Sequence, residues 1–106
     1  MSYHVEFMEE AAKDLKELDS SIQPPIVTAI LKVSRNPLPK SEGGLGKPLG
    51  NKHGSNLTGC FKIKLLKLGI RVVYKLVRVE ETMKIVVIAA RADDEVYEIA
   101  AKRIKE

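Results

Sequence analysis

Hydrophobic and polar residues alternate most regularly over positions 58–78. Successive side chains of a strand point to opposite faces, so regular alternation predicts a strand with one buried face. The apolar positions of the first half are Phe61, Ile63 and Leu65. Those of the second half are Ile70, Val72, Tyr74 and Leu76. The stretch therefore predicts two β-strands joined by a tight turn at 67–69, where Gly69 follows Lys67 and Leu68.

The flanking segments carry the other elements of the predicted fold. Their apolar periodicity predicts a strand over 2–7, helices over 8–19 and 21–35, a strand over 83–90 and a helix over 93–104. The run 83–90 is almost continuously apolar, which is typical of a strand covered on both faces. The order β-α-α-β-β-β-α predicts an α+β fold. We expect a mostly antiparallel four-stranded sheet with an N-terminal helical hairpin and a C-terminal helix, the helices on one face.

Residues 36–56 are rich in glycine and proline and predict a long loop. Loops of this length inside a small domain are uncommon and are often functional or mobile. The loop carries three lysines: Lys40, Lys47 and Lys52. Gly46-Lys47 is followed by Pro48 and is not preceded by a strand, so the phosphate-cradling P-loop motif is not matched.

Length and composition predict one domain over 1–106. No apolar run approaches the ~20 residues that a membrane span needs, and the N-terminus lacks the pattern of a signal peptide. Cys60, the single cysteine, excludes an internal disulfide, and with two distant histidines it does not make a zinc site. We therefore expect a cytoplasmic protein without a metal or other cofactor.

Positive charge is concentrated in the middle of the chain. The net charge is +4, but residues 21–78 carry eleven basic residues and one acidic residue, Glu42. Alternation places Lys62, Lys64 and Arg71 on the polar face of the predicted hairpin. Cations gathered on one sheet face attract a polyanion such as a nucleic acid. The alternative is a solvated basic face without a partner.

Two segments resemble a known family. The runs GCFKIKLLKLGIRVVYKL and VVIAARADDEVYEIAAKRI resemble the RelE toxins of bacterial and archaeal toxin–antitoxin systems. The wider RelE/ParE superfamily shares the predicted order of elements. The resemblance implies a ribosome-dependent, metal-independent endoribonuclease that cuts mRNA in the A site of the small ribosomal subunit. It also implies a cognate RelB-like antitoxin that silences the toxin.

The resemblance assigns five catalytic positions. They are Lys62 and Lys64 of the K-x-K strand, Arg71 of the G-x-R-x-x-Y strand, Arg91 after the last strand, and Tyr97 of the E-V-Y helix segment. Four further lysines are candidate RNA contacts: Lys47, Lys52, Lys67 and Lys75. The segment between Arg91 and Tyr97 is acidic here, where a well-studied relative is basic, and the loop 36–56 is longer.

RNA cleavage by its own 2′-hydroxyl needs a base, charge stabilisation at the phosphate and a proton for the 5′-oxygen. A lysine among cations has a lowered pKa, so Lys62 or Lys64 can serve as the base. Arg71 and Arg91 remain charged and can hold the phosphate, while the acid role of Arg91 rests on the resemblance. Tyr97 can stack on a nucleobase of the RNA or assist proton transfer. His4 and His53 have no evident partner, and we interpret both as structural or incidental.

Each of these residues also has a purely structural interpretation. Arg71 can pair with Glu80 or Glu81, and Arg91 with Asp94 or Glu95. Tyr97 can lie in the core, where we also expect Tyr74. We expect Cys60 to be buried or incidental rather than a nucleophile, because no partner for it is evident nearby. Two other functions compete with the nuclease: inhibition of DNA gyrase, as by ParE toxins, and non-catalytic binding of nucleic acid.

Overall fold

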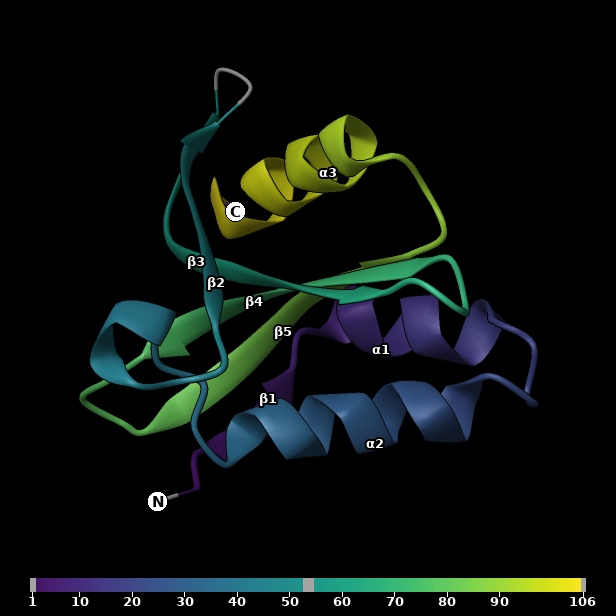
Figure 1. Cartoon of the computed structure of the whole chain (residues 1–106). Helices are drawn as coiled ribbons and strands as arrows, with labels where there is room; N and C mark the ends of the chain where they lie inside the picture. The colour runs from purple at the N-terminus through teal and green to yellow at the C-terminus, as the bar shows by residue number, and fades with distance from the viewer. Residues whose placement is uncertain (1, 53–54, 106) are drawn as a thin grey trace.

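The computed structural model describes residues 2–52 and 55–105 (Figure 1). Its strands are β1 (His4–Phe7), β2 (Lys47–Lys52), β3 (Ser55–Leu65), β4 (Ile70–Val77) and β5 (Thr82–Ala89). Its helices are α1 (Glu9–Glu17), α2 (Gln23–Ser34), the short 3-10 helix η1 (Lys40–Glu42) and α3 (Asp93–Lys105). The strands form one five-stranded sheet in the order β1-β5-β4-β3-β2. The predicted α+β fold is confirmed. No helix of the described ranges is long and apolar enough to span a membrane.

The sheet differs from the prediction in strand number and direction. It is mixed, because β1 lies parallel to β5 while every other neighbouring pair is antiparallel. The predicted four strands become five because β2 lies inside the segment that we expected to be a loop. β2 has no alternating pattern, and only Leu49 of its residues before position 51 is buried. Pairing with β3 holds this strand, despite a register shift between Pro48 and Gly50.

The prediction that all helices cover one face of the sheet is wrong. Figure 1 shows α1 and α2 below the sheet and α3 above it. Two hydrophobic cores result. The first packs Ala11, Ile26 and Ile30 of the hairpin helices against the face of β3 that carries Phe61 and Ile63.

The second core lies between α3 and the opposite face of the sheet. It contains Val96 and Ala100 of α3 and, from the sheet, Cys60, Val73 and Val87. The continuous apolar run of β5 supplies side chains to both cores, in agreement with the prediction for that strand. The second face of the sheet is thus apolar where α3 covers it and basic beyond the start of the helix.

The segment before β2 is packed against the sheet. The Tyr74 hydroxyl, fully buried, donates a hydrogen bond of 2.8 Å to the carbonyl of Pro37. A Cβ on Gly46 would lie 2.7 Å from that hydroxyl and 2.8 Å from the Phe61 ring, so only glycine fits there. Phe61 and Tyr74 stack with ring centroids 5.2 Å apart. Tyr74 is therefore a core residue, as predicted.

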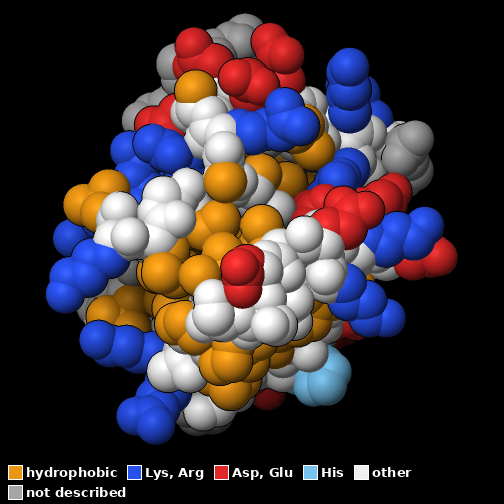
Figure 2. All heavy atoms as spheres, turned by 90° about the vertical axis from the view of Figure 1, so that its right-hand side faces the viewer, with side chains coloured by type: hydrophobic (Ala, Val, Ile, Leu, Met, Phe, Trp, Pro, Cys, Tyr) orange, Lys and Arg blue, Asp and Glu red, His pale blue; other side chains and the backbone are white. Residues whose placement is uncertain are grey.

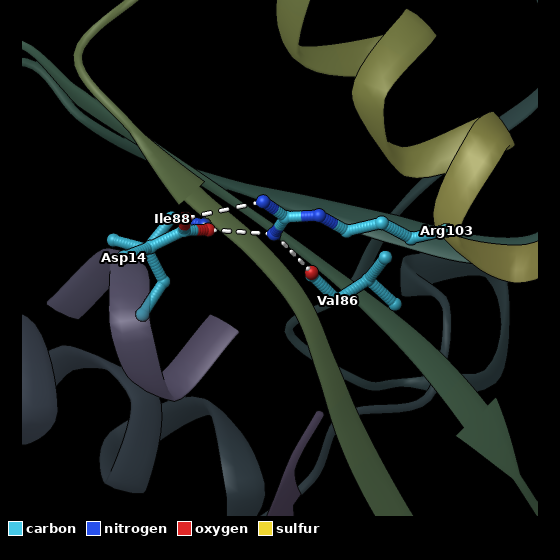
Figure 3. A network of polar contacts seen from close by, with 4 residues as sticks. All are labelled: Asp14, Val86, Ile88 and Arg103. Atoms are coloured by element: carbon cyan, nitrogen blue, oxygen red, sulfur yellow. Dashed lines mark hydrogen bonds and ion pairs between the residues drawn. The ribbon is translucent and has the colours of Figure 1, made fainter. Parts of the chain in front are cut away.

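One edge of β5 is completed by side chains. Pairing with β1 runs to Phe7 and Ile85, and Val86 is then an extra residue in the register with β4. Beyond that point the backbone N–H of Ile88 donates to Oδ2 of Asp14 at 3.0 Å. Nη1 of Arg103 donates to the Val86 carbonyl at 2.9 Å (Figure 3). Two side chains thus supply hydrogen bonds that a neighbouring strand would otherwise make.

Asp14 and Arg103 also bind each other, and so connect α1 with α3. Nη1 and Nη2 of Arg103 donate to Oδ2 and Oδ1 of Asp14 at 2.7 and 3.1 Å. Both side chains are 18% exposed, so the pair is well shielded from water. The two helices lie on opposite faces of the sheet, and this contact fixes α3 relative to the rest of the fold.

We expect Asp14→Ala to lower the free energy of unfolding by about 2–3 kcal/mol, because it leaves the Ile88 N–H and the Arg103 guanidinium without their acceptor. Glu17→Ala, an exposed acidic position on the same helix, is the control and should cost less than about 0.5 kcal/mol. Urea unfolding followed by circular dichroism measures both. Equal values for the two variants would contradict the role given to Asp14.

Candidate functional site: a row of cations at the start of α3

A row of cations crosses three strands on the face that α3 partly covers. Lys62 lies opposite Lys47 of β2, and Lys64 lies opposite Arg71 of β4. Residues directly opposite in an antiparallel pair share a face, and so do residues two apart on one strand. All four cations therefore lie on the same side of the sheet. The alternation of the hairpin predicted this arrangement for Lys62, Lys64 and Arg71.

Asp93, the first residue of α3, lies between two of these cations. Its Oδ2 is 3.0 Å from Nζ of Lys64, and its Oδ1 accepts a hydrogen bond from Nε of Arg71. Nη1 of Arg71 donates to the carbonyl of Arg91 at 2.9 Å. The end of β5 and the start of α3 are thus both held by Arg71. The predicted alternative pairing of Arg71 with Glu80 or Glu81 is replaced by the pairing with Asp93.

The pKa of the Asp93 carboxyl lies below its ordinary value of 3.8. The hydrogen bond from Lys64 is the largest cause and that from Arg71 also contributes, while burial acts in the opposite direction. The carboxylate is therefore ionised at neutral pH. Sequence patterns missed Asp93 as a site residue, although the acidic departure at 93–94 from the basic segment of a relative was a signal for it.

Arg91 contacts Arg71 through its backbone carbonyl and a neighbouring carboxylate through its side chain. Its Nη1 donates to Oε2 of Glu95 at 3.2 Å, one of the two structural alternatives predicted for it. The guanidinium is 59% exposed, so solvent reaches this pair. Both residues also line a groove of about 680 Å³ whose other lining residues come from the end of β5 and from α1 and α3.

Tyr97 lies in the second core and is 2% exposed. Burial raises the pKa of its phenol, and the negative charge of Asp93 adds to this effect. The hydroxyl therefore stays protonated at neutral pH. In this conformation the ring packs in the core and is not positioned to stack on a base.

The remaining predicted residues lie on β2, on β4 and in the β3–β4 turn. Lys47 and Lys67 are exposed, the latter in the β3–β4 turn. Lys75 is opposite Cys60 in the β3–β4 register, four residues further along β4 than Arg71, and lines a small cleft with Lys84 and Arg103. Lys52 ends β2, and its side chain is outside the described part of the structure. His4 lies on β1, and His53 is outside the described residues.

Cys60 is buried in the second core, as expected, and burial raises the pKa of its thiol to about 11. A thiol with this pKa is a poor nucleophile at neutral pH. Over residues 2–52 and 55–105, no three side chains of His, Cys, Asp or Glu gather in a way that would hold a metal ion. The charged groups that meet beside the start of α3 are the ammonium of Lys64, the guanidinium of Arg71 and the carboxylate of Asp93.

Comparisons with known proteins agree with this architecture, although no family model matches the chain. It is 30% identical over 105 residues to a RelE-like toxin protein of Escherichia coli, covering 99% of this chain and 100% of that protein. It is 28% identical over 104 residues to the mRNA interferase toxin RelE of E. coli strain K12, covering 98% and 99%.

Solved structures show the same similarity. A mutant E. coli RelE toxin in the free state superposes with a TM-score of 0.75 at 26% identity, covering 98% of this chain and 99% of that one. The toxin–antitoxin complex RelBE2 of Mycobacterium tuberculosis contains a chain that superposes with a TM-score of 0.67 at 29% identity, covering 88% and 95%.

We expect Lys64→Met to raise the pKa of Asp93 toward its ordinary value, because Lys64 supplies the largest effect on it. The depressed pKa means that the contribution of Asp93 to stability is present above its pKa in the unfolded chain and is lost as the pH falls through its pKa in the folded protein. NMR titration of the Asp93 side-chain carboxyl measures the shift. Lys67→Met, in the adjacent turn, should leave the Asp93 titration unchanged.

Proposed function

This chain belongs to the RelE family of toxins, and we propose on that basis that it is the toxin of a type II toxin–antitoxin system and an endoribonuclease that cleaves mRNA. A similar protein is named an mRNA interferase, and a similar structure is a toxin–antitoxin complex. The observation that carries the proposal is the cation row, in which Lys62, Lys64 and Arg71 share one sheet face beside the start of α3.

The cation row suits an attack of the 2′-oxygen on the adjacent phosphorus. The 2′-oxygen forms a bond to phosphorus while the bond from phosphorus to the 5′-oxygen breaks. The proton of the 2′-hydroxyl passes to the uncharged amine form of one lysine, Lys62 or Lys64, while the other stays an ammonium, and the leaving 5′-oxygen takes up a proton from Arg91. Negative charge grows on the phosphate oxygens during this step, and fixed cations stabilise it without having to reorganise.

Arg71 is the central phosphate ligand of the proposed site. Its guanidinium already binds a carboxylate oxygen with Nε and a carbonyl oxygen with Nη1, so its planar fork faces two acceptors. In the proposed complex the side chain of Arg91 leaves Glu95 for the phosphate. The family resemblance is the basis for giving Arg91 the role of proton donor to the 5′-oxygen.

Tyr97 enters the site through α3. The ring lies in the second core, so contact with a nucleobase requires it to leave this position. We propose that Tyr97 orients the scissile nucleotide. Lys47 and Lys67 are exposed and extend the basic surface for RNA, and Lys52 and Lys75 complete the proposed set of RNA contacts.

The proposed partners are the ribosome, its bound mRNA and an antitoxin. The A site of the small subunit would present the codon to the cation row. The basic residues of β2 and of the β3–β4 turn would then face the nucleic acid. A RelB-like antitoxin with an acidic helical segment would complement the same surface.

We expect Arg71→Ala and Arg91→Ala each to reduce mRNA cleavage by about a hundredfold or more, because each removes a cation that stabilises the transition state. Mapping of mRNA ends relative to the reading frame in a translating extract measures cleavage. Arg78→Ala is the matched control, since Arg78 lies beyond the other end of β4 and pairs with Glu42 at 2.7 Å.

The two arginine variants should also fail to arrest growth while they keep their circular dichroism spectra and still bind the antitoxin, Arg71→Ala more weakly because Arg71 belongs to the cation row. Full toxicity of both folded variants would overturn the nuclease proposal and favour inhibition of gyrase. Wild-type expression without any effect on growth or translation would favour a simple nucleic-acid-binding protein.

A short gene beside this one should encode the antitoxin, with an acidic segment that forms a helix. We expect its product, added at saturation to the translating extract, to abolish cleavage because it neutralises and covers the cation row. The control is a peptide that has the amino-acid composition of the acidic antitoxin segment in a scrambled order. Unchanged cleavage with bound antitoxin would reject this account of inhibition.

A further inference from the structure

The proposed phosphate site already holds an anion that belongs to the chain. Asp93 places its Oδ2 at 3.0 Å from Nζ of Lys64 and its Oδ1 on Nε of Arg71. A phosphodiester offers two oxygens of similar charge and spacing, and lysine and arginine bind carboxylates and phosphates through the same charge-assisted hydrogen bonds. The carboxylate thus has the position and the chemistry of a phosphate ligand.

We propose that Asp93 is an internal competitor for RNA: its carboxylate occupies the phosphate subsite of Lys64 and Arg71, and the substrate phosphodiester must displace it. This inference rests on the proposed function for the identity of the substrate. It adds a residue that controls the affinity of the site and a resting state in which one carboxylate of the fold pairs with two of the cations and offsets part of their charge.

The exposure of the contact makes displacement feasible. Lys64, Arg71 and Asp93 are 30%, 28% and 32% exposed, whereas both members of the Asp14–Arg103 pair are 18% exposed. Ion pairs that solvent reaches are worth little individually and exchange readily, while shielded pairs are costly to break. The fold therefore holds one carboxylate firmly and the other in a position from which an incoming anion can remove it.

Displacement of Asp93 would also release the start of α3. Asp93 begins the helix, and Arg71 holds the carbonyl of Arg91 just before it. A phosphate that takes over Arg71 competes with both contacts. The first turn of α3 would then lose two of the contacts that hold it beside β4.

Asp93→Asn tests the proposal, because asparagine keeps the size of the side chain and its compatibility with a helix start while it removes the charge. The probe is a hexanucleotide of 2′-O-methyl RNA, which can bind but has no 2′-hydroxyl to attack. We expect the variant to bind it about tenfold more tightly than the wild type at low salt, since two competing ion pairs are lost.

Glu98→Gln removes the same charge from an exposed position on the same helix and is the control. It should change the affinity for the probe by less than about twofold, because only the general field of the domain is altered. A role of Asp93 that is only structural predicts that Asp93→Asn lowers both stability and RNA affinity. The competitor proposal instead predicts lower stability, measured by thermal unfolding, together with higher affinity.

The outcomes separate this proposal from the proposed function. If the wild type cleaves mRNA but Asp93→Asn binds the probe no more tightly than Glu98→Gln, the competitor proposal is wrong and the nuclease proposal stands. If no variant cleaves mRNA but Asp93→Asn still binds tenfold more tightly, the subsite is an anion site with an internal competitor and the nuclease proposal fails.

Discussion

The hydrogen bonds of Asp14 and Arg103 at the edge of β5 fix the arrangement on which the site depends. β5 lies between β1 and β4, but its pairing with β1 stops at Ile85, and an unpaired strand edge inside a fold is unfavourable. Asp14 reaches this edge from α1 and Arg103 from α3, and each satisfies a backbone group of β5. The same pair binds helices from opposite faces to one strand, so the start of α3 has a defined place over the cation row.

Much of the fold follows from hydrophobic periodicity, because strong alternation and amphipathic stripes reflect local geometry. The hairpin β3–β4 and the helices α1 and α2 have such patterns, and the structure contains all of them. β2 has none, since its proline and glycine weaken any strand preference and its order comes from pairing with β3. The face on which α3 packs is also not a local property. It depends on where the chain crosses the sheet after β5, although the doubly apolar run of that strand required cover on both sides.

For the site too, local sequence patterns predicted some residues and missed those that depend on the tertiary fold. Alternation along two paired strands was sufficient to place Lys62, Lys64 and Arg71 on one face. Asp93 was missed because its partners lie on β3 and β4, and only the tertiary fold brings the start of α3 to them. The family resemblance names Tyr97 and Arg91, but it does not show that the first is buried in a core and that the second is paired with Glu95.

A row of four cations on one sheet face carries an electrostatic cost in the absence of a ligand. Like charges that face each other across strands destabilise a sheet, and the middle of this chain has almost no acidic residues to offset them. Asp93 supplies a counterion from the next element of the fold. An acidic residue at the start of α3 therefore stabilises the resting protein for the same reason that it opposes a phosphate: both effects arise from its attraction to Lys64 and Arg71. A basic residue there would favour RNA and leave the free protein with greater self-repulsion, so the charge at position 93 sets the balance between stability of the domain and affinity for its substrate.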